Sequence, residues 1–215
     1  MWYILGALAA AVFLFLAVIL IRGAMFRPLP EEKPQAGDVM LDEDKIVGHM
    51  VELLRCKTNS YNDDSLIDKG EFEKFRELLP KLYPQVHKIC TREFIGNTGI
   101  LYRWKGKTPE NPVVLMSHYD VVPVEEDRWE KPAFAGIVEN GVIWGRGTLD
   151  TKGTLCGVME AAESLLEQGY VPEHDIYFSF GGDEEINGPT VPAIVAELER
   201  RGIRPAMVVD EGGAV

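Results

Sequence analysis

The sequence predicts an α/β domain that is preceded by a transmembrane helix. Short runs of β-branched and aromatic residues alternate along the chain with longer segments whose apolar residues recur at helical spacing. Strands that alternate with helices in this way form a mostly parallel sheet with helices on both faces. The first 21 residues, in contrast, are nearly all apolar and carry no charge.

Length and composition are those of a globular protein. The 215 residues are 46% hydrophobic and 26% charged, which is enough to bury one core. With 22 basic and 34 acidic residues the formal charge is -12, so the surface would repel a phosphate backbone and no nucleic acid is expected as a partner. Cys56, Cys90 and Cys156 are far apart and odd in number, which predicts buried free thiols.

Residues 1–21 are predicted to be a single-pass membrane anchor. As a helix they would span about 31 Å, which is the thickness of a bilayer core. A cleaved signal peptide is the alternative, but the stretch has no basic start and no clear cleavage site. Arg22, Arg27 and Lys33 all follow it, which would leave the globular part in the cytoplasm. One short flank does not settle the side of the membrane, so both orientations stay open.

The next stretch, residues 22–40, is predicted to be a tether. Helix-breaking residues are frequent in it, namely Pro28, Pro30, Pro34 and Gly37. The folded domain is therefore expected over residues 41–215. Its predicted elements, in chain order, are a helix from about residue 42, a helix ending before residue 84, strands at 87–92, 99–104 and 113–116, a hairpin of 136–138 with 142–144, a helix over 151–168, a strand at 176–180, a helix at 191–200 and a strand at 206–209.

Acidic residues and one histidine follow three of these strands. Ligands of open α/β sheets bind beyond the carboxyl ends of the strands, so these side chains should meet at one edge. Neighbouring carboxylates repel unless a cation lies between them, and histidine with carboxylates suits zinc, or less specifically manganese or cobalt. The side chains are His118 and Asp120 after 113–116, Asp183, Glu184 and Glu185 after 176–180, Asp210 and Glu211 after 206–209, and Asp150 before the long helix.

Each of these groups has a simpler interpretation when it is taken alone. His118 could be a core histidine, and Asp150 could be the N-cap of the helix that follows it. The acidic runs 183–185 and 210–213 could be surface turns. Their joint occurrence favours a metal site. The sequence contains no H-E-x-x-H motif and no G-x-S-x-G elbow, and the glycines of 145–148 lack the spacing of a phosphate loop.

Three motifs agree in order, spacing and flanking glycines with those of a known enzyme family. They are His-Tyr-Asp-Val-Val-Pro at 118–123, Trp-Gly-Arg-Gly-Thr-Leu-Asp-Thr-Lys-Gly at 144–153 and Gly-Asp-Glu-Glu at 182–185. They closely resemble the aminoacylase/carboxypeptidase family of co-catalytic zinc metallopeptidases. The residues of the second motif and of the Asp-Glu-Gly-Gly turn most resemble those found in the branch that contains carboxypeptidase S and the N-fatty-acyl-amino-acid hydrolases. The resemblance runs from about residue 42 onward.

The resemblance implies two zinc ions and a role for each motif residue. His118 would bind one zinc, Asp150 would bridge both, and Glu185 would bind the other. Glu211 would complete the first zinc's ligands, with its neighbour Asp210 as the alternative. The two catalytic positions would be Glu184 as general base and Asp120 as the support of His118.

The implied function is hydrolysis of an amide bond that releases an amino acid from a peptide or an N-acyl amino acid. A metal-bridged water would be the nucleophile and Glu184 the base. Family members are much longer, with a lid or dimerisation domain and a C-terminal histidine for the second zinc. We therefore expect this chain to be the N-terminal part of a zinc exopeptidase-like domain, incomplete and inactive by itself, whose whole form could be a homodimer.

Two other hypotheses stay open. The chain could be an inactive or truncated, non-catalytic module that is tethered to a membrane and keeps the motifs without the activity. It could also keep the fold but use one metal, or act on a non-peptide substrate such as a succinyl amide.

Overall fold

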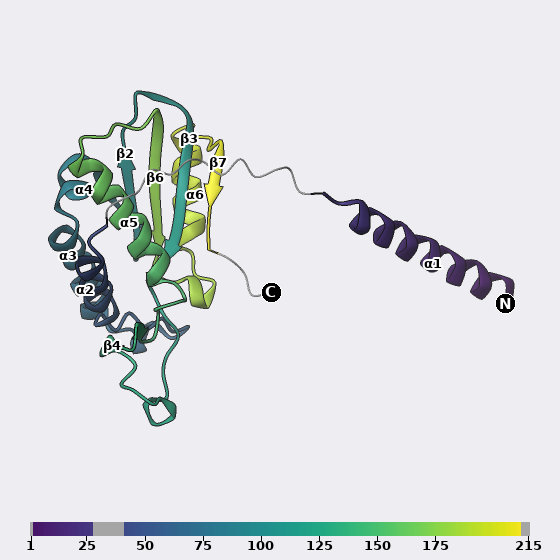
Figure 1. The fold of residues 1–215 in the computed structure, drawn as a ribbon, viewed down its shortest axis with the longest axis horizontal. Helices are drawn as coiled ribbons and strands as arrows, with labels where there is room; N and C mark the ends of the chain where they lie inside the picture. The colour runs from purple at the N-terminus through teal and green to yellow at the C-terminus, as the bar shows by residue number, and fades with distance from the viewer. Residues whose placement is uncertain (1, 28–40, 212–215) are drawn as a thin grey trace. The chain divides into compact units, whose positions relative to one another are not determined.

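The computed structural model describes residues 2–27 and 41–211, which belong to two separate units (Figure 1). The first unit contains helix α1 and the second is an α/β unit that begins at Leu41. Most of the predicted tether, at 28–40, and the Gly212-Gly213 pair lie outside the described residues.

Helix α1 (Trp2–Met25) is long and apolar enough to cross a membrane, a test that an N-terminal signal sequence also passes. None of its residues is buried. It extends past the predicted end at residue 21, because a charge such as Arg22 ends an apolar run without ending a helix.

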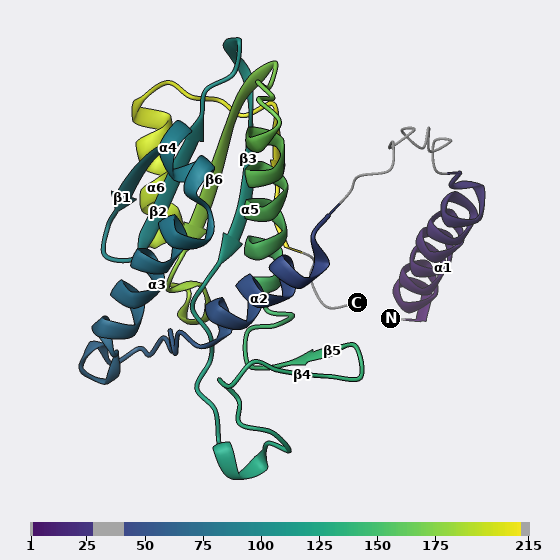
Figure 2. The same cartoon turned by 60° about the vertical axis from the view of Figure 1, so that its left-hand side comes forward.

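The main sheet has five strands in the order β1-β2-β6-β3-β7, of which Figure 1 labels β2, β6, β3 and β7 and Figure 2 labels β1. Strand β3 pairs in parallel with β6 and β7, whereas β1 with β2 and β2 with β6 are antiparallel. The prediction of a mostly parallel sheet is therefore only partly right. The strands are β1 (Thr91–Ile95), β2 (Gly99–Trp104), β3 (Thr108–His118), β6 (His174–Gly181) and β7 (Met207–Val209).

The antiparallel pairing of β1 with β2 follows from the short connection between them. A parallel pair needs a long crossover, but only three residues separate Ile95 from Gly99. Gly96 has a φ of +61°, which a side chain would disfavour, and it turns the chain back directly. Strands β3, β6 and β7 are joined through helices α5 and α6, which allows their parallel pairing.

Helices cover both faces of the sheet, as predicted (Figure 2). On one face, Phe178 and Phe180 of β6 pack with Leu155 and Met159 of the long helix α5. On the other face, Leu101, Val114 and Tyr177 pack with a single helix, α6. The helices are α2 (Glu43–Leu54), α3 (Lys69–Leu82), α4 (Pro84–Ile89) and α5 (Lys152–Glu167) on the first face, and α6 (Thr190–Arg200) on the second.

Most predicted elements agree with the structure. The hairpin consists of β4 (Ile137–Glu139) and β5 (Val142–Trp144), and its turn residues Asn140 and Gly141 have φ values of +53° and +76°. Positive φ at both central residues matches the right-handed twist of a hairpin. The three cysteines are free and buried, as predicted.

The strand predicted at residues 87–92 begins too early, because helix α4 continues to Ile89 and strand β1 begins only at Thr91. Pro84 is suited to the first helical position, where its missing N–H costs nothing. The buried Glu163 carboxylate of α5 accepts hydrogen bonds from the backbone N–H groups of Gln85 and Val86, at 2.9 and 2.8 Å. This cap comes from a residue far along the chain, so no local pattern could reveal it.

Replacing Glu163 with alanine should destabilise the α/β unit by about 2 kcal/mol, because two buried N–H groups would lose a charged acceptor. Urea unfolding of the chain in detergent micelles measures the change. Glu167→Ala removes an exposed carboxylate from the next turn of α5 and is the control. Equal unfolding midpoints for both variants would show that Glu163 does not stabilise α4.

Candidate metal centre

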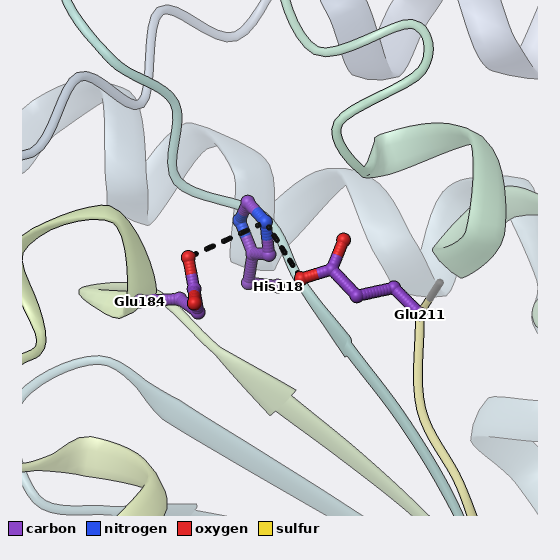
Figure 3. A group of neighbouring side chains, drawn as sticks. All are labelled: His118, Glu184 and Glu211. Carbon is purple, nitrogen blue, oxygen red and sulfur yellow. Dashed lines mark ion pairs between the residues drawn. The ribbon is translucent and has the colours of Figure 1, made fainter. Parts of the chain in front are cut away.

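The predicted site residues meet at the carboxyl edge of the parallel strands. Strand β3 ends at His118, which lies opposite Gly181 at the end of β6. A short 3-10 helix, η3 (Glu184–Ile186), follows β6 at once. Glu211 comes directly after β7, and Figure 3 shows its carboxylate and that of Glu184 on either side of the His118 ring.

Three carboxylates surround Nε2 of His118. It lies 2.9 Å from Oδ1 of Asp150, 3.4 Å from Oε1 of Glu211 and 3.7 Å from Oε2 of Glu184. The imidazole is only 2% exposed, whereas the Asp150 side chain is 63% exposed and that of Glu184 47%. The ring therefore forms the floor of the site, and the carboxylates form its open side.

The donor atoms are close enough to hold a divalent cation. In each of two groups, His118 with Glu184 and Glu211, and His118 with Asp150 and Glu185, the candidate ligand atoms lie within 4.8 Å of one another. One imidazole nitrogen with several carboxylate oxygens is a donor set for zinc, manganese or cobalt. All four predicted ligands are thus brought together, and Glu184, the predicted base, lies among them.

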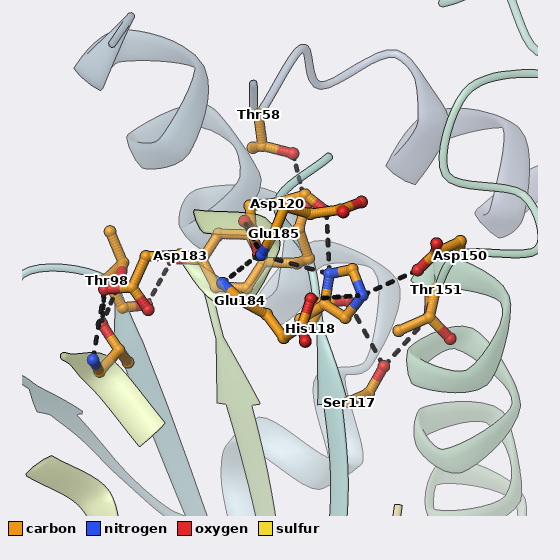
Figure 4. A network of polar contacts seen from close by, with 12 residues as sticks. Thr58, Thr98, Ser117, His118, Asp120, Asp150, Thr151, Asp183, Glu184 and Glu185 are labelled. Atoms are coloured by element: carbon orange, nitrogen blue, oxygen red, sulfur yellow. Dashed lines mark hydrogen bonds and ion pairs between the residues drawn. The ribbon is translucent and has the colours of Figure 1, made fainter. Parts of the chain in front are cut away.

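Asp120 has no exposed surface and connects two parts of the site (Figure 4). Its Oδ1 lies 3.3 Å from Nδ1 of His118, and its main-chain carbonyl lies 3.0 Å from the same nitrogen. Because a carbonyl only accepts, Nδ1 carries the hydrogen and Nε2 faces the carboxylates. The Asp120 carboxylate also accepts from the N–H groups of Glu184 and Glu185, at 3.1 and 3.2 Å.

The charges of the site favour a cation or bound protons. Burial alone would lower the pKa of His118, but the carboxylates of Asp120 and Glu211 outweigh it and raise this pKa to about 9. Burial raises the pKa of Glu185 and of Glu211, and the Asp150 carboxylate raises both further. A divalent ion among these groups would replace the proton and remove the repulsion.

Asp150 does not act as a helix cap. The N-cap of α5 is Thr151, and no side chain makes a cap hydrogen bond there. The carbonyl of Thr151 accepts a hydrogen bond from Oγ of Ser117, at 3.0 Å. The peptide bond between Asp150 and Thr151 is cis. The Asp150 side chain turns toward His118, so the capping interpretation of this residue is wrong.

The two acidic residues after β7 are placed differently. Glu211 lies beside His118, whereas Oδ1 of Asp210 accepts a hydrogen bond from the N–H of Glu211, at 3.0 Å. This arrangement agrees with Glu211 as the predicted ligand. The other histidines are in α2 (His49), in α4 (His87) and at the start of β6 (His174), away from the carboxyl edge.

The sequence did not reveal how Asp183 contributes. Its side chain is buried, and Oδ2 accepts from the N–H and Oγ1 of Thr190, at 3.2 and 2.7 Å. A Cβ on Gly188 would lie only 2.2 Å from Cγ of Asp183, so glycine is needed there. Asp183 thus closes the turn that carries Glu184 and Glu185. In the sequence, only Gly188 and Thr190 could have indicated this role of Asp183.

The comparisons with known proteins agree with this geometry. Residues 114–214 match the model of peptidase family M20/M25/M40. A probable carboxypeptidase S-like 2 of Dictyostelium discoideum is 38% identical over 152 residues, which are 69% of this chain and 29% of that protein. Over these residues the chain is similar to this family. The resemblance inferred from the three motifs is therefore confirmed.

Other relatives are similar in sequence, and a solved structure has a similar fold. The N-fatty-acyl-amino acid synthase/hydrolase PM20D1 of Homo sapiens is 37% identical over 145 residues, 66% of this chain and 29% of that protein. The Xenopus tropicalis PM20D1 is 32% identical and matches 100% of this chain but 44% of its own length. The M20 metallo-carboxypeptidase Sso-CP2 of Sulfolobus solfataricus shares the fold, with a TM-score of 0.62, 23% identity and coverage of 81% of this chain and 38% of that one. The chain thus spans less than half the length of these relatives.

Metal binding by this chain should depend steeply on pH. The metal-free site keeps a proton on His118 up to a pKa of about 9, and a cation must displace it. The apparent affinity for Zn²⁺ is therefore expected to rise about tenfold per pH unit between roughly pH 6 and 8. Competition with a chelator in detergent micelles measures it. The His87→Gln variant should show the same slope, and an affinity that is flat over this range would contradict the account.

Proposed function

We propose that this chain is the metal-binding part of a membrane-anchored M20 hydrolase that releases an amino acid from a peptide or an N-acyl amino acid by cleaving an amide bond. The observation that carries the proposal is the position of Glu184. Its carboxylate is 47% exposed and lies within 3.7 Å of His118 Nε2, among the four predicted ligands. A base in this place can reach both the solvent and a bound substrate.

Two zinc ions are the proposed cofactors, with manganese or cobalt as alternatives. As the resemblance implies, His118, Asp150 and Glu211 would hold the first ion, and Asp150 and Glu185 would contribute to the second. All four residues belong to the two groups of close donor atoms that share His118. A divalent cation in such a site lowers the pKa of a water molecule and polarises a carbonyl group. A histidine from outside these residues would complete the second set, as the resemblance implies.

The catalytic roles follow from how the protein holds each group. Glu184 would accept a proton from the attacking water and donate it to the leaving amine. Its backbone N–H is fixed by the buried Asp120 carboxylate, which also faces His118. Asp120 would therefore align the base with the floor of the site.

A cavity beside the site suits an apolar part of a substrate. Its volume is about 370 Å³, and it runs from Glu184 and Glu211 toward the apolar side chains of Met116, Val191 and Pro192. Relatives named as carboxypeptidase S-like proteins and as N-fatty-acyl-amino acid hydrolases support both proposed substrate classes. Helix α1 would hold the enzyme at a membrane.

The Glu184→Gln variant tests the proposal directly. In the full-length product of the coding sequence, kcat on a dipeptide or N-acyl amino acid should fall about 10²- to 10⁴-fold, because the general base is lost. Zinc content should stay at the wild-type value. Glu77→Gln, on the exposed side of α3, is the matched control. A wild-type protein without bound metal, or a Glu184→Gln variant with unchanged kcat, would overturn the proposal.

A further inference from the structure

Lys152 is a fully buried lysine two residues after Asp150. It is the first residue of α5, and its Nζ donates hydrogen bonds to the main-chain carbonyls of Leu53, at 3.1 Å, and Cys56, at 2.6 Å. The ring of Phe75 lies 5.5 Å from the same nitrogen. Burying a lysine is costly unless its amino group is hydrogen-bonded, so this position needs an explanation.

Both acceptors lie at the carboxyl end of α2. The last carbonyls of a helix have no partner within it and form the negative end of its dipole. The Lys152 amino group supplies donors at this place. Helices α2 and α5 lie side by side on the same face of the sheet (Figure 2). Lys152 therefore joins the end of one helix to the start of the other.

The segment after α2 is in turn bonded to the residues around Asp120. The N–H of Val121 donates to the carbonyl of Thr58 at 2.9 Å, and the N–H of Ser60 donates to the carbonyl of Val121 at 3.1 Å. Oγ1 of Thr58 also donates to the carbonyl of Tyr119. One short stretch of chain thus connects the acceptors of Lys152 to the support of His118.

Two further hydrogen bonds hold the backbone of the two residues that follow Asp150. The N–H of Lys152 donates to the carbonyl of Gly147 at 2.9 Å, and Oγ of Ser117 holds the carbonyl of Thr151. Gly147 has a φ of +89°, and a Cβ there would meet Cδ of Lys152 at 3.3 Å. A side chain at Gly147 would therefore crowd both the lysine stem and Cγ1 of Val121, which would lie 2.8 Å from that Cβ.

We propose that Lys152 is a positioning residue of the metal centre. By bonding to the end of α2, it fixes where Asp150 stands relative to His118, and so the spacing of the ligands. The inference rests on the proposed function, because it treats both residues as ligands. A methionine in its place fills the same volume but removes the amino group that joins the two carbonyls to α5. Each carbonyl then keeps only a backbone donor, Cys56 N–H at 3.3 Å for Leu53 and Thr58 N–H at 3.0 Å for Cys56, and the α2 end loses its link to the start of α5.

Cobalt binding to the full-length protein tests this role without using activity. We expect Lys152→Met to fold normally by circular dichroism, to bind Co²⁺ about 10- to 100-fold more weakly and to show altered visible absorption bands, as for lost supports of metal ligands. Lys152→Gln should fall between wild type and Lys152→Met, since its shorter amide reaches one carbonyl. Lys45→Met is the control, because Lys45 joins α2 to α5 through an exposed ion pair with Glu167.

The outcomes separate the two proposals. Wild-type affinity and bands in Lys152→Met would overturn the positioning role and leave a buried cation that affects only folding. If Lys152→Met does not fold, a folded Lys152→Gln variant with wild-type Co²⁺ binding overturns it equally. A wild-type protein that binds no Co²⁺ contradicts the proposed function instead.

Discussion

The buried Asp120 carboxylate is the interaction on which the rest of the site depends. It lies 3.3 Å from Nδ1 of His118 and accepts two backbone N–H groups from the start of η3. His118 comes from β3 and η3 follows β6, so one carboxylate aligns the ends of two neighbouring strands. Without this carboxylate, the imidazole and the Glu184-Glu185 pair would lose the group that both contact and that fixes their relative position.

A second constraint is the concentration of negative charge on the open side of the imidazole. Asp150, Glu184 and Glu211 all lie within 3.7 Å of a single nitrogen. Without a cation, their repulsion is relieved by a proton on His118, whose pKa is raised to about 9. The same arrangement that destabilises the metal-free site would therefore favour a bound divalent ion.

The sequence predicted those features that leave a local pattern. The amphipathic helices α2 and α3 show apolar spacing because one face of each is buried, and Asn140-Gly141 marks the hairpin by its backbone preference. The site could be predicted because strand ends meet at one edge of a sheet. Its residues were found as a set, although each had a simpler interpretation alone.

The features that were missed depend on contacts between distant parts of the chain. Helix α4 is capped by Glu163, which a local pattern cannot show. The antiparallel half of the sheet depends on where β2 inserts, beside β6 rather than beside β3. Lys152 stands in a recognised motif, but its acceptors, Leu53 and Cys56, lie about a hundred residues earlier.

The most direct test of the account is anomalous diffraction at the zinc edge from crystals of the full-length protein. The account predicts a zinc peak at bonding distance, about 2.0–2.1 Å, from Nε2 of His118, with Asp150 and Glu211 as further ligands. A structure in which Nε2 of His118 still contacts the Asp150 carboxylate directly, with no anomalous peak beside it, would contradict the account.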